Sequence, residues 1–343
     1  MTFHAEAFAL ESDRGFAAHE FETAPAPNSE CLLRLSPRHG EGTAQARVRY
    51  ALYGAIDAPV VIVQGGISAD RYAAQPNGSP GWWAGVVGSG CAIDTLRFRV
   101  LTIEWLEKSD FVDAAPRAIG SEDQADAIAA VLGELGIRRA HAFVGASYGA
   151  MVALAFAARH PQRVRRLVAI AGAHRAHPLA VAVRTLQREI VRLGDRLGDA
   201  SAGLDLARRL AMTTYRGERE FAERCGAAPE FRDGRYRFAS EDWLEAAGAR
   251  FVQRFGVERF LALSESIDLH EIAPEDVRVP TTLIGIASDR LVPLADLCEL
   301  QRRAGAPASL HVIDSRYGHD AFLKETGAIG PLIADALGTE RLQ

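Results

Sequence analysis

A serine between two glycines is the residue whose type and surroundings most clearly suggest chemistry. The segment Phe143 to Met151 reads Phe-Val-Gly-Ala-Ser-Tyr-Gly-Ala-Met, so Ser147 lies between an apolar strand-like run and an alanine-rich helix-like run. A sharp strand-to-helix turn of this Gly-x-Ser-x-Gly type presents the serine hydroxyl to a substrate above a helix N-terminus. We therefore predict that Ser147 is a nucleophile and that the backbone N–H of Tyr148 binds the developing oxyanion.

An activated serine needs a histidine that takes its proton and a carboxylate that orients the histidine. Asp289 follows the apolar run Thr282 to Ile286, and His319 follows the last such run, Leu310 to Ile313. The chain order of serine, acid and histidine is the one expected after this type of turn. We predict that Ser147, Asp289 and His319 form a catalytic triad. Weaker candidates for the acid are Asp296 and Asp314.

The second oxyanion donor is expected from the loop after an earlier strand. The loop Gln64-Gly65-Gly66-Ile67-Ser68 follows the run Val60 to Val63. Its two adjacent glycines let the backbone approach a substrate closely. We predict that the backbone N–H of Gly66 or of Ile67 is this donor, and the sequence leaves both open.

These candidates are distributed along a chain in which short β-branched runs alternate with helix-like segments. Such alternation predicts an α/β fold with a mostly parallel sheet. One helix is expected to have Ser121 as its N-cap and to stop at Gly136. The predicted strands are Arg47 to Tyr53, Val60 to Val63, Phe98 to Ile103, Ala140 to Val144, Val164 to Ile170, Thr282 to Ile286 and Leu310 to Ile313.

Between the fifth and sixth of these runs the pattern changes to Arg-, Leu- and Ala-rich helical segments without strands. We predict a sheet-and-helix core formed by residues 1–173 and 275–343, with residues 174–274 as an inserted helical cap. The charge-rich stretch Arg184 to Arg196 is expected to be a solvated helix face.

Composition narrows the classes of partner. The 343 residues include 48% apolar and 24% charged residues, which is the ordinary mix of a globular protein with a sizeable core. A net charge of −5 gives no general attraction to nucleic acid or to a membrane, so small-molecule substrates are expected. The uncharged stretch Ala140 to Ala158 is long enough to suggest a membrane span, but its predicted strand, turn and helix exclude that interpretation.

Cysteine usage and the N-terminal segment both favour a cytoplasmic location. The four cysteines are far apart and form no Cys-x-x-Cys pair, so no disulfide framework and no metal site are predicted. The segment Met1 to Phe21 contains several acidic residues, which excludes a secretory signal peptide. The cysteines are Cys31, Cys91, Cys225 and Cys298.

Several further motifs resemble the homoserine O-acyltransferases of methionine biosynthesis, which have the α/β-hydrolase fold. The resemblance covers most of the chain and includes the serine turn itself. Its other motifs are Gly81-Trp82-Trp83, Gly88-Ser89-Gly90, Ala92-Ile93-Asp94-Thr95, the segment Leu206 to Arg216 and Tyr317-Gly318-His319-Asp320-Ala321-Phe322-Leu323.

The resemblance implies an activity and additional site residues. It implies transfer of an acyl group from acyl-CoA to the hydroxyl of L-homoserine through an acyl-serine, with acyl-CoA as co-substrate and no bound cofactor. Asp320 would bind the substrate ammonium group, and Arg208 would bind its carboxylate, with Arg209 and Arg216 as competitors for that role. It also implies a homodimer.

Two departures from the family pattern leave the substrates open. The stretch after Phe98 to Ile103 lacks the family's glycine-rich loop, and the sequence Gln-Gly-Gly-Ile-Ser stands where the family more often has His-Ala-Leu-Thr-Gly. Acetyl and succinyl donors, and serine in place of homoserine, therefore remain candidates. A hydrolase with the same triad is a second hypothesis, and a non-catalytic binding protein of the same fold is a third.

Overall fold

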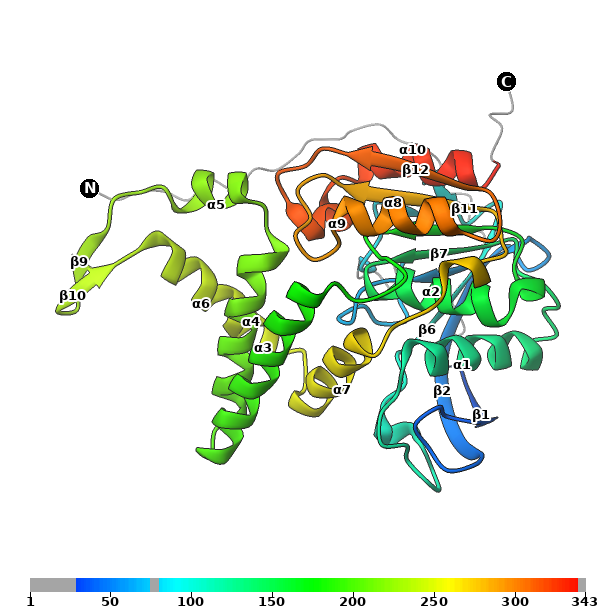
Figure 1. Cartoon of the computed structure of the whole chain (residues 1–343), viewed down its shortest axis with the longest axis horizontal. Coiled ribbons are helices and arrows are strands. Elements are labelled where there is room, and N and C mark those ends of the chain that lie inside the picture. Colours follow the sequence, from blue (N-terminus) through cyan, green and yellow to red (C-terminus); the bar gives the residue numbers. More distant parts are fainter. Residues whose placement is uncertain (1–28, 75–79, 339–343) are drawn as a thin grey trace, which may run out of the picture.

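An eight-stranded sheet forms the centre of the protein (Figure 1). The computed structural model describes residues 29–74 and 80–338, and the predicted N-terminal feature at Met1 to Phe21 lies outside them. The strand order is β1-β2-β6-β3-β7-β8-β11-β12, in which β1 and β2 are antiparallel to their neighbours and the other strands are parallel. These strands are β1 Ser29–Leu35, β2 Ala44–Gly54, β3 Val60–Gln64, β6 Arg99–Ile103, β7 Ala142–Ala146, β8 Leu167–Ile170, β11 Thr281–Ile286 and β12 Ala308–Ile313.

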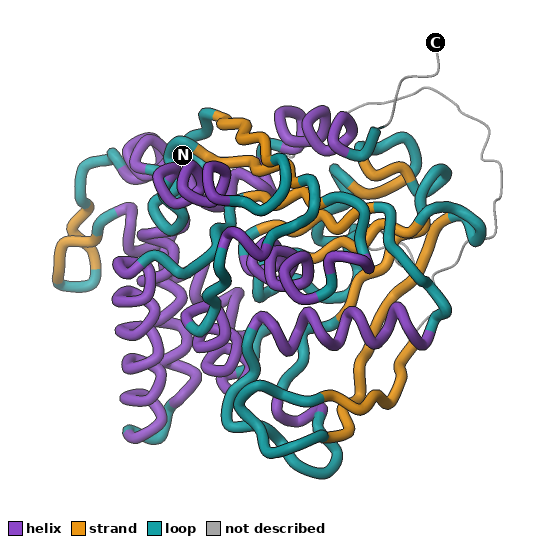
Figure 2. The backbone as a smooth tube through the Cα atoms, turned by 45° about the vertical axis from the view of Figure 1, so that its right-hand side comes forward, coloured by secondary structure: helices purple, strands orange, loops and turns teal. Residues whose placement is uncertain are grey.

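Helices cover both faces of this sheet (Figures 1 and 2). Buried residues of α1, α2 and α8 form one apolar cluster with one face of the strands, and α10 packs with the loops after β3 and β5 on the other face. The predicted mostly parallel α/β architecture is confirmed. The helices of these layers are α1 Ser121–Glu134, α2 Tyr148–Arg159, α8 Leu294–Arg303, α9 Ala321–Lys324 and α10 Thr326–Ala336, and a small additional sheet pairs β4 Val87–Gly88 with β5 Ile93–Asp94.

A largely helical segment connects β8 to β11. Helices α3 and α4 pack along each other and extend away from the sheet, whereas α7 returns toward it (Figure 1). The division into core and cap at residues 174–274 stays a prediction. The elements of this segment are α3 Pro178–Arg196, α4 Ala200–Tyr215, α5 Glu218–Cys225, β9 Glu230–Arg232, β10 Arg235–Arg237, α6 Ala239–Val252 and α7 Val257–Asp268.

Several details differ from the sequence-based expectations. Strand β1, an edge strand with alternating burial, was not predicted. The helical segment contains the hairpin β9–β10 although no strand was expected there. Ser121 is not the N-cap of α1, because Gly120 occupies that position and Ser121 is the first helical residue. The hydroxyl of Ser121 is instead hydrogen-bonded to His270.

The uncharged stretch Ala140 to Ala158 contains β7, the serine turn and most of α2. Within the described residues, no helix combines the length and the apolar character needed to cross a membrane.

Candidate active site

Ser147 lies at a strained turn between β7 and α2. Its backbone has φ 57° and ψ −121°, which a residue with a side chain rarely adopts and which is typical of functional sites. The flanking glycines make the turn possible, since a Cβ on Gly145 would lie 2.2 Å from the carbonyl oxygen of Gly149. A Cβ on Gly149 would lie 2.2 Å from the carbonyl oxygen of Gln64. The Gly-x-Ser-x-Gly spacing is therefore a steric requirement of this turn.

The structure brings Ser147, His319 and Asp289 together from three loops at the carboxyl ends of β7, β12 and β11. Ser147 Oγ is 2.7 Å from His319 Nε2, and His319 Nδ1 is 2.6 Å from Asp289 Oδ2. The other carboxylate oxygen of Asp289 accepts hydrogen bonds from the backbone N–H groups of Leu291 and Val292, at 2.8 and 3.1 Å. These two hydrogen bonds fix the orientation of the Asp289 carboxylate, which in turn orients the imidazole of His319.

The electrostatics of His319 suit a proton acceptor. Burial alone lowers the pKa of the imidazole, but the charge of Asp289 and its hydrogen bond to Nδ1 outweigh burial and raise the pKa above its ordinary value. Because Nδ1 must carry the proton that faces the carboxylate, Nε2 is the nitrogen that accepts the hydrogen bond from the Ser147 hydroxyl. This is the tautomer required for removing the serine proton.

Neither of the weaker acid candidates contacts His319. The side chain of Asp314 is 81% exposed and forms an ion pair with Arg219. Asp296 is buried in the first turn of α8.

The predicted oxyanion donors lie next to Ser147 in the chain or in the loop after β3. A Cβ on Gly66 would lie 3.8 Å from Ser147 Oγ, so the loop after β3 lies directly against the serine. Within the described residues, the backbone N–H groups of Gly66, Ile67 and Tyr148 donate to no other group. Unpaired N–H groups at this place are available to an anion.

A small cavity of about 30 Å³ adjoins Ser147 and His319, and Arg184 of α3 lines it. Arg184 is only 7% exposed, so its prediction as part of a solvated helix face is wrong. Its Nε donates to Asp268 Oδ1 of α7 at 2.6 Å, whereas its Nη2 is buried and has no hydrogen-bond partner in the described part of the chain. A buried cationic nitrogen without a partner, in a cavity that Ser147 also lines, is suited to bind a carboxylate.

A sequence signal for Arg184 does exist. The buried residues of α3 are Ala180, Arg184, Gln187 and Val191, which recur at helical spacing along one stripe. Arg184 thus occupies a position on the apolar side of an amphipathic helix, where a charged side chain needs a buried partner.

The two residues expected to hold the amino acid lie near the triad, each with contacts of its own. Asp320 follows His319 in a short 3-10 helix, and its Oδ2 is 3.0 Å from Nε of Arg216. The guanidinium of Arg208 lies over the ring of Tyr215, at 5.3 Å, and over that of Phe251. Arg209, a competitor for the carboxylate, instead pairs with Asp205 and Glu245.

A second serine–histidine pair lies deeper in the protein and lacks the features of a triad. Ser121 Oγ is 2.7 Å from His270 Nδ1, and His270 Nε2 is 3.1 Å from the carbonyl oxygen of Ala173. No carboxylate among the described residues orients this histidine, and burial lowers its pKa to about 3. We interpret this pair as a structural link between α1 and the end of α7.

Among the residues that the structure describes, no group of three His, Cys, Asp or Glu side chains could hold a metal ion. The four cysteines are free thiols.

Comparisons with known proteins identify the fold and the similar proteins. A family model described as alpha/beta hydrolase fold matches residues 58–326, which confirms the predicted fold class. A homoserine O-succinyltransferase of Xanthomonas campestris pv. campestris is 49% identical over 324 residues, which cover 94% of this chain and 87% of that protein. A serine O-succinyltransferase of the same species is 33% identical over an alignment of 371 positions, and the alignment covers 91% of this chain and 96% of that protein.

Solved structures give the same fold. The homoserine O-acetyltransferase of Bacillus anthracis superposes with a TM-score of 0.82 at 19% identity, over 90% of this chain and 97% of that one. At this identity the likeness concerns the fold alone.

Proposed function

Because the chain belongs to the homoserine O-acyltransferase family of the α/β-hydrolase fold, we propose that it transfers a succinyl group from succinyl-CoA to the hydroxyl of L-homoserine. In this proposal Ser147, His319 and Asp289 are the catalytic triad. The acyl group passes through an ester of Ser147. Serine fits less well as the acceptor, because the serine-acylating relative is more distant than the homoserine-acylating one.

The unpaired Nη2 of Arg184 is the observation that supports the succinyl donor. A succinyl group differs from an acetyl group by a terminal carboxylate, which needs a cationic partner when it enters a buried site. Arg184 supplies that partner in the cavity beside Ser147, and Asp268 holds its guanidinium by Nε. An acetyl group would leave the same nitrogen buried and unpaired.

In the first half-reaction Ser147 Oγ attacks the thioester carbonyl while His319 Nε2 takes the hydroxyl proton. The carbonyl oxygen becomes an oxyanion, which the backbone N–H groups of Tyr148 and of Gly66 or Ile67 stabilise. The C–S bond then breaks, and His319 gives the proton to the CoA sulfur. The products are free CoA thiol and succinyl-Ser147.

In the second half-reaction the homoserine hydroxyl attacks the ester carbon and gives its proton to His319. The bond to Ser147 Oγ breaks, and His319 returns the proton to the serine. We propose that Asp320 binds the homoserine ammonium group. Its carboxylate, which pairs with Arg216, would then contact both cations. Arg208 is the proposed carboxylate ligand. Its guanidinium lies over the ring of Tyr215, and the centroid of that ring is 5.9 Å from the centroid of the His319 ring.

Mass spectrometry of the intact protein tests this proposal. Mixed with succinyl-CoA alone, the protein is expected to gain one succinyl group on Ser147, faster than it gains an acetyl group from acetyl-CoA. Adding homoserine then discharges the adduct. Asp320→Asn is expected to form the adduct at a normal rate and to discharge it slowly, since only the second half-reaction uses the ammonium group.

Other outcomes would replace the proposal. Discharge by water at the same rate with and without homoserine would identify a hydrolase. Faster labelling by acetyl-CoA would assign the acetyl donor, and faster discharge by serine would assign serine as the acceptor. No adduct with either donor would favour a non-catalytic binding protein.

We also propose that the protein is a cytoplasmic homodimer, with helix α3 at the contact between the two copies. Leu179, Leu186 and Leu193 recur every seven residues on the outer face of α3 and are 60%, 54% and 49% exposed. Two helical turns separate successive leucines, so they form one apolar stripe, which a second copy can cover with the same stripe. Figure 1 shows α3 extending away from the sheet.

Replacement of one leucine checks this contact. Leu186→Glu is expected to convert a dimer into a monomer in size-exclusion chromatography with light scattering, because it buries a charge in the stripe. The matched control is Leu96→Glu, since Leu96 is equally exposed on a loop of the core and should leave the dimer intact. A monomeric parent protein would exclude the proposed contact.

A further inference from the structure

One tryptophan contacts both halves of the proposed oxyanion hole. The indole N–H of Trp105 donates to the carbonyl oxygen of Gly66 at 3.0 Å, and the backbone N–H of Ala69 donates to the same oxygen at 3.0 Å. The Trp105 ring also packs edge-on against Tyr148, with ring centroids 4.8 Å apart. Trp105 is fully buried, and its hydrogen bond to Gly66 is partly buried.

The Gly66 carbonyl is a sensitive point because of peptide geometry. A peptide unit is planar, so fixing the carbonyl of Gly66 also fixes the N–H of Ile67 across the same bond and limits rotation about the Gly66 backbone. Two adjacent glycines would otherwise leave this stretch with wide conformational freedom. The hydrogen bond from Trp105 therefore restricts the backbone at the position where an oxyanion donor must be held.

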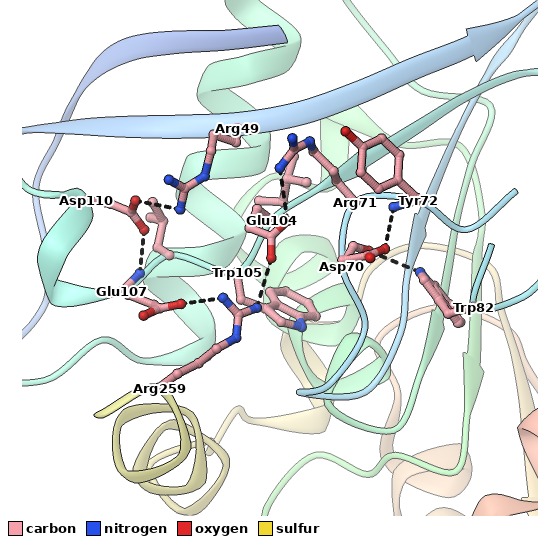
Figure 3. A network of polar contacts seen from close by, with 12 residues as sticks. Arg49, Asp70, Arg71, Tyr72, Trp82, Glu104, Trp105, Glu107, Asp110 and Arg259 are labelled. Carbon is pink, nitrogen blue, oxygen red and sulfur yellow. Dashed lines mark hydrogen bonds and ion pairs between the residues drawn. The ribbon is translucent and has the colours of Figure 1, made fainter. Parts of the chain in front are cut away.

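The segment that carries Trp105 is itself tied to helix α7 by ion pairs (Figure 3). Arg259 of α7 pairs with Glu104 at 3.1 Å and with Glu107, the residues on either side of Trp105 and Leu106. Glu104 also pairs with Arg71 of the loop after β3, at 3.3 Å. These carboxylates and guanidinium groups are mostly buried, so solvent screens them less than surface pairs.

We propose that Trp105 is a positioning residue of the oxyanion hole, and that Arg259 anchors it from helix α7. Trp105 does not touch the substrate in this proposal. It holds the Gly66–Ile67 peptide against Ser147 before the acyl donor binds, so that no reorganisation is needed when negative charge develops. The proposal rests on Ser147 being the nucleophile.

Trp105→Phe tests it, since phenylalanine keeps the buried ring and removes the N–H. Acylation of Ser147 by p-nitrophenyl acetate, measured by stopped-flow, is expected to slow about tenfold. This loss is smaller than the 10²- to 10³-fold loss of rate expected when an oxyanion donor is itself removed. KM should change by less than about twofold, because the variant affects only the developing charge. Affinity for a boronic acid, whose tetrahedral adduct places an oxygen in the hole, should fall by a similar factor.

A second tryptophan provides the matched control. Trp83 is equally buried, and its N–H donates to the carbonyl oxygen of Phe322 at 2.9 Å. Trp83→Phe should lower the melting temperature about as much as Trp105→Phe and change the acylation rate by less than about twofold.

Three results would overturn the proposal. These are an unchanged acylation rate in Trp105→Phe, an equal loss in both variants, or a loss that appears only in KM. If the parent protein itself is not labelled at Ser147, the proposed function fails and this role fails with it. A labelled parent with a fully active Trp105→Phe variant rejects the positioning role alone.

Discussion

Ser147→Ala is expected to abolish both half-reactions and to lower kcat by about 10⁴- to 10⁶-fold, as removal of a serine nucleophile does in other triads. The variant leaves the oxyanion donors and His319 in place but removes the atom that carries the acyl group. Release of CoA thiol in the presence of homoserine measures the loss. Intact-protein mass spectrometry of the same variant should show no adduct with either acyl-CoA.

The second serine–histidine pair offers a control with the same local chemistry. Ser121→Ala removes a hydroxyl that is also 2.7 Å from an imidazole nitrogen, yet turnover should stay within about twofold. Its cost should appear in stability, at about 1–3 kcal/mol, because the buried Nδ1 of His270 loses its donor. Substantial activity in Ser147→Ala, or loss of activity in a folded Ser121→Ala, would contradict the assignment of the nucleophile.

Arg184→Leu is expected to change donor preference. Loss of a charge-assisted hydrogen bond of about 1.5–3 kcal/mol should lower kcat/KM for succinyl-CoA about 10- to 100-fold. The value for acetyl-CoA should change by less than about threefold, since an acetyl group has no carboxylate for the guanidinium to bind. Steady-state kinetics with both donors at fixed homoserine concentration give the ratio directly.

Arg188 is the control for this change. It lies one turn further along α3, and its Nη1 donates to Asp268 Oδ2 at 2.6 Å, but it does not line the cavity. Arg188→Leu should destabilise the contact between α3 and α7 and leave the ratio of donor efficiencies unchanged. A loss confined to kcat/KM for homoserine in Arg184→Leu would instead assign Arg184 to the carboxylate of the amino acid, because only the second half-reaction uses that substrate.

The core architecture and the convergence of Ser147, Asp289 and His319 could be predicted because they depend on local patterns. Parallel strands end at one edge of a sheet, so residues that follow separate strands converge there although they are distant in sequence. Asp289 and His319 each follow a strand closely, and the structure brings both to Ser147. The glycine pattern of the turn is likewise a local steric requirement that the sequence displays directly.

The contacts of Arg184, Ser121 and Trp105 could not be predicted, because each depends on a partner that no local pattern identifies. Helical spacing places Arg184 on the buried side of α3, but it does not identify the partner Asp268, which lies 84 positions later. The sequence around Ser121 resembles that of an N-cap, but in the structure its hydroxyl is hydrogen-bonded to His270, 149 positions later. Trp105 lies where the family resemblance shows only a missing loop.

Helix α7 contacts three separate parts of the site. Arg259 holds the segment of Trp105, Ser266 bonds the hydroxyl of Tyr148 at 2.5 Å, and Asp268 holds Arg184. These contacts couple α7 to the oxyanion loop, the serine turn and the proposed donor pocket at once. A chimaera that exchanged residues 174–274 for the matching segment of a relative would therefore combine the relative's α7 with its own serine turn and its own Trp105 segment. A boundary at the end of α6 would keep Arg259 and Ser266 with the segments that they contact, but it would separate Arg184 from Asp268.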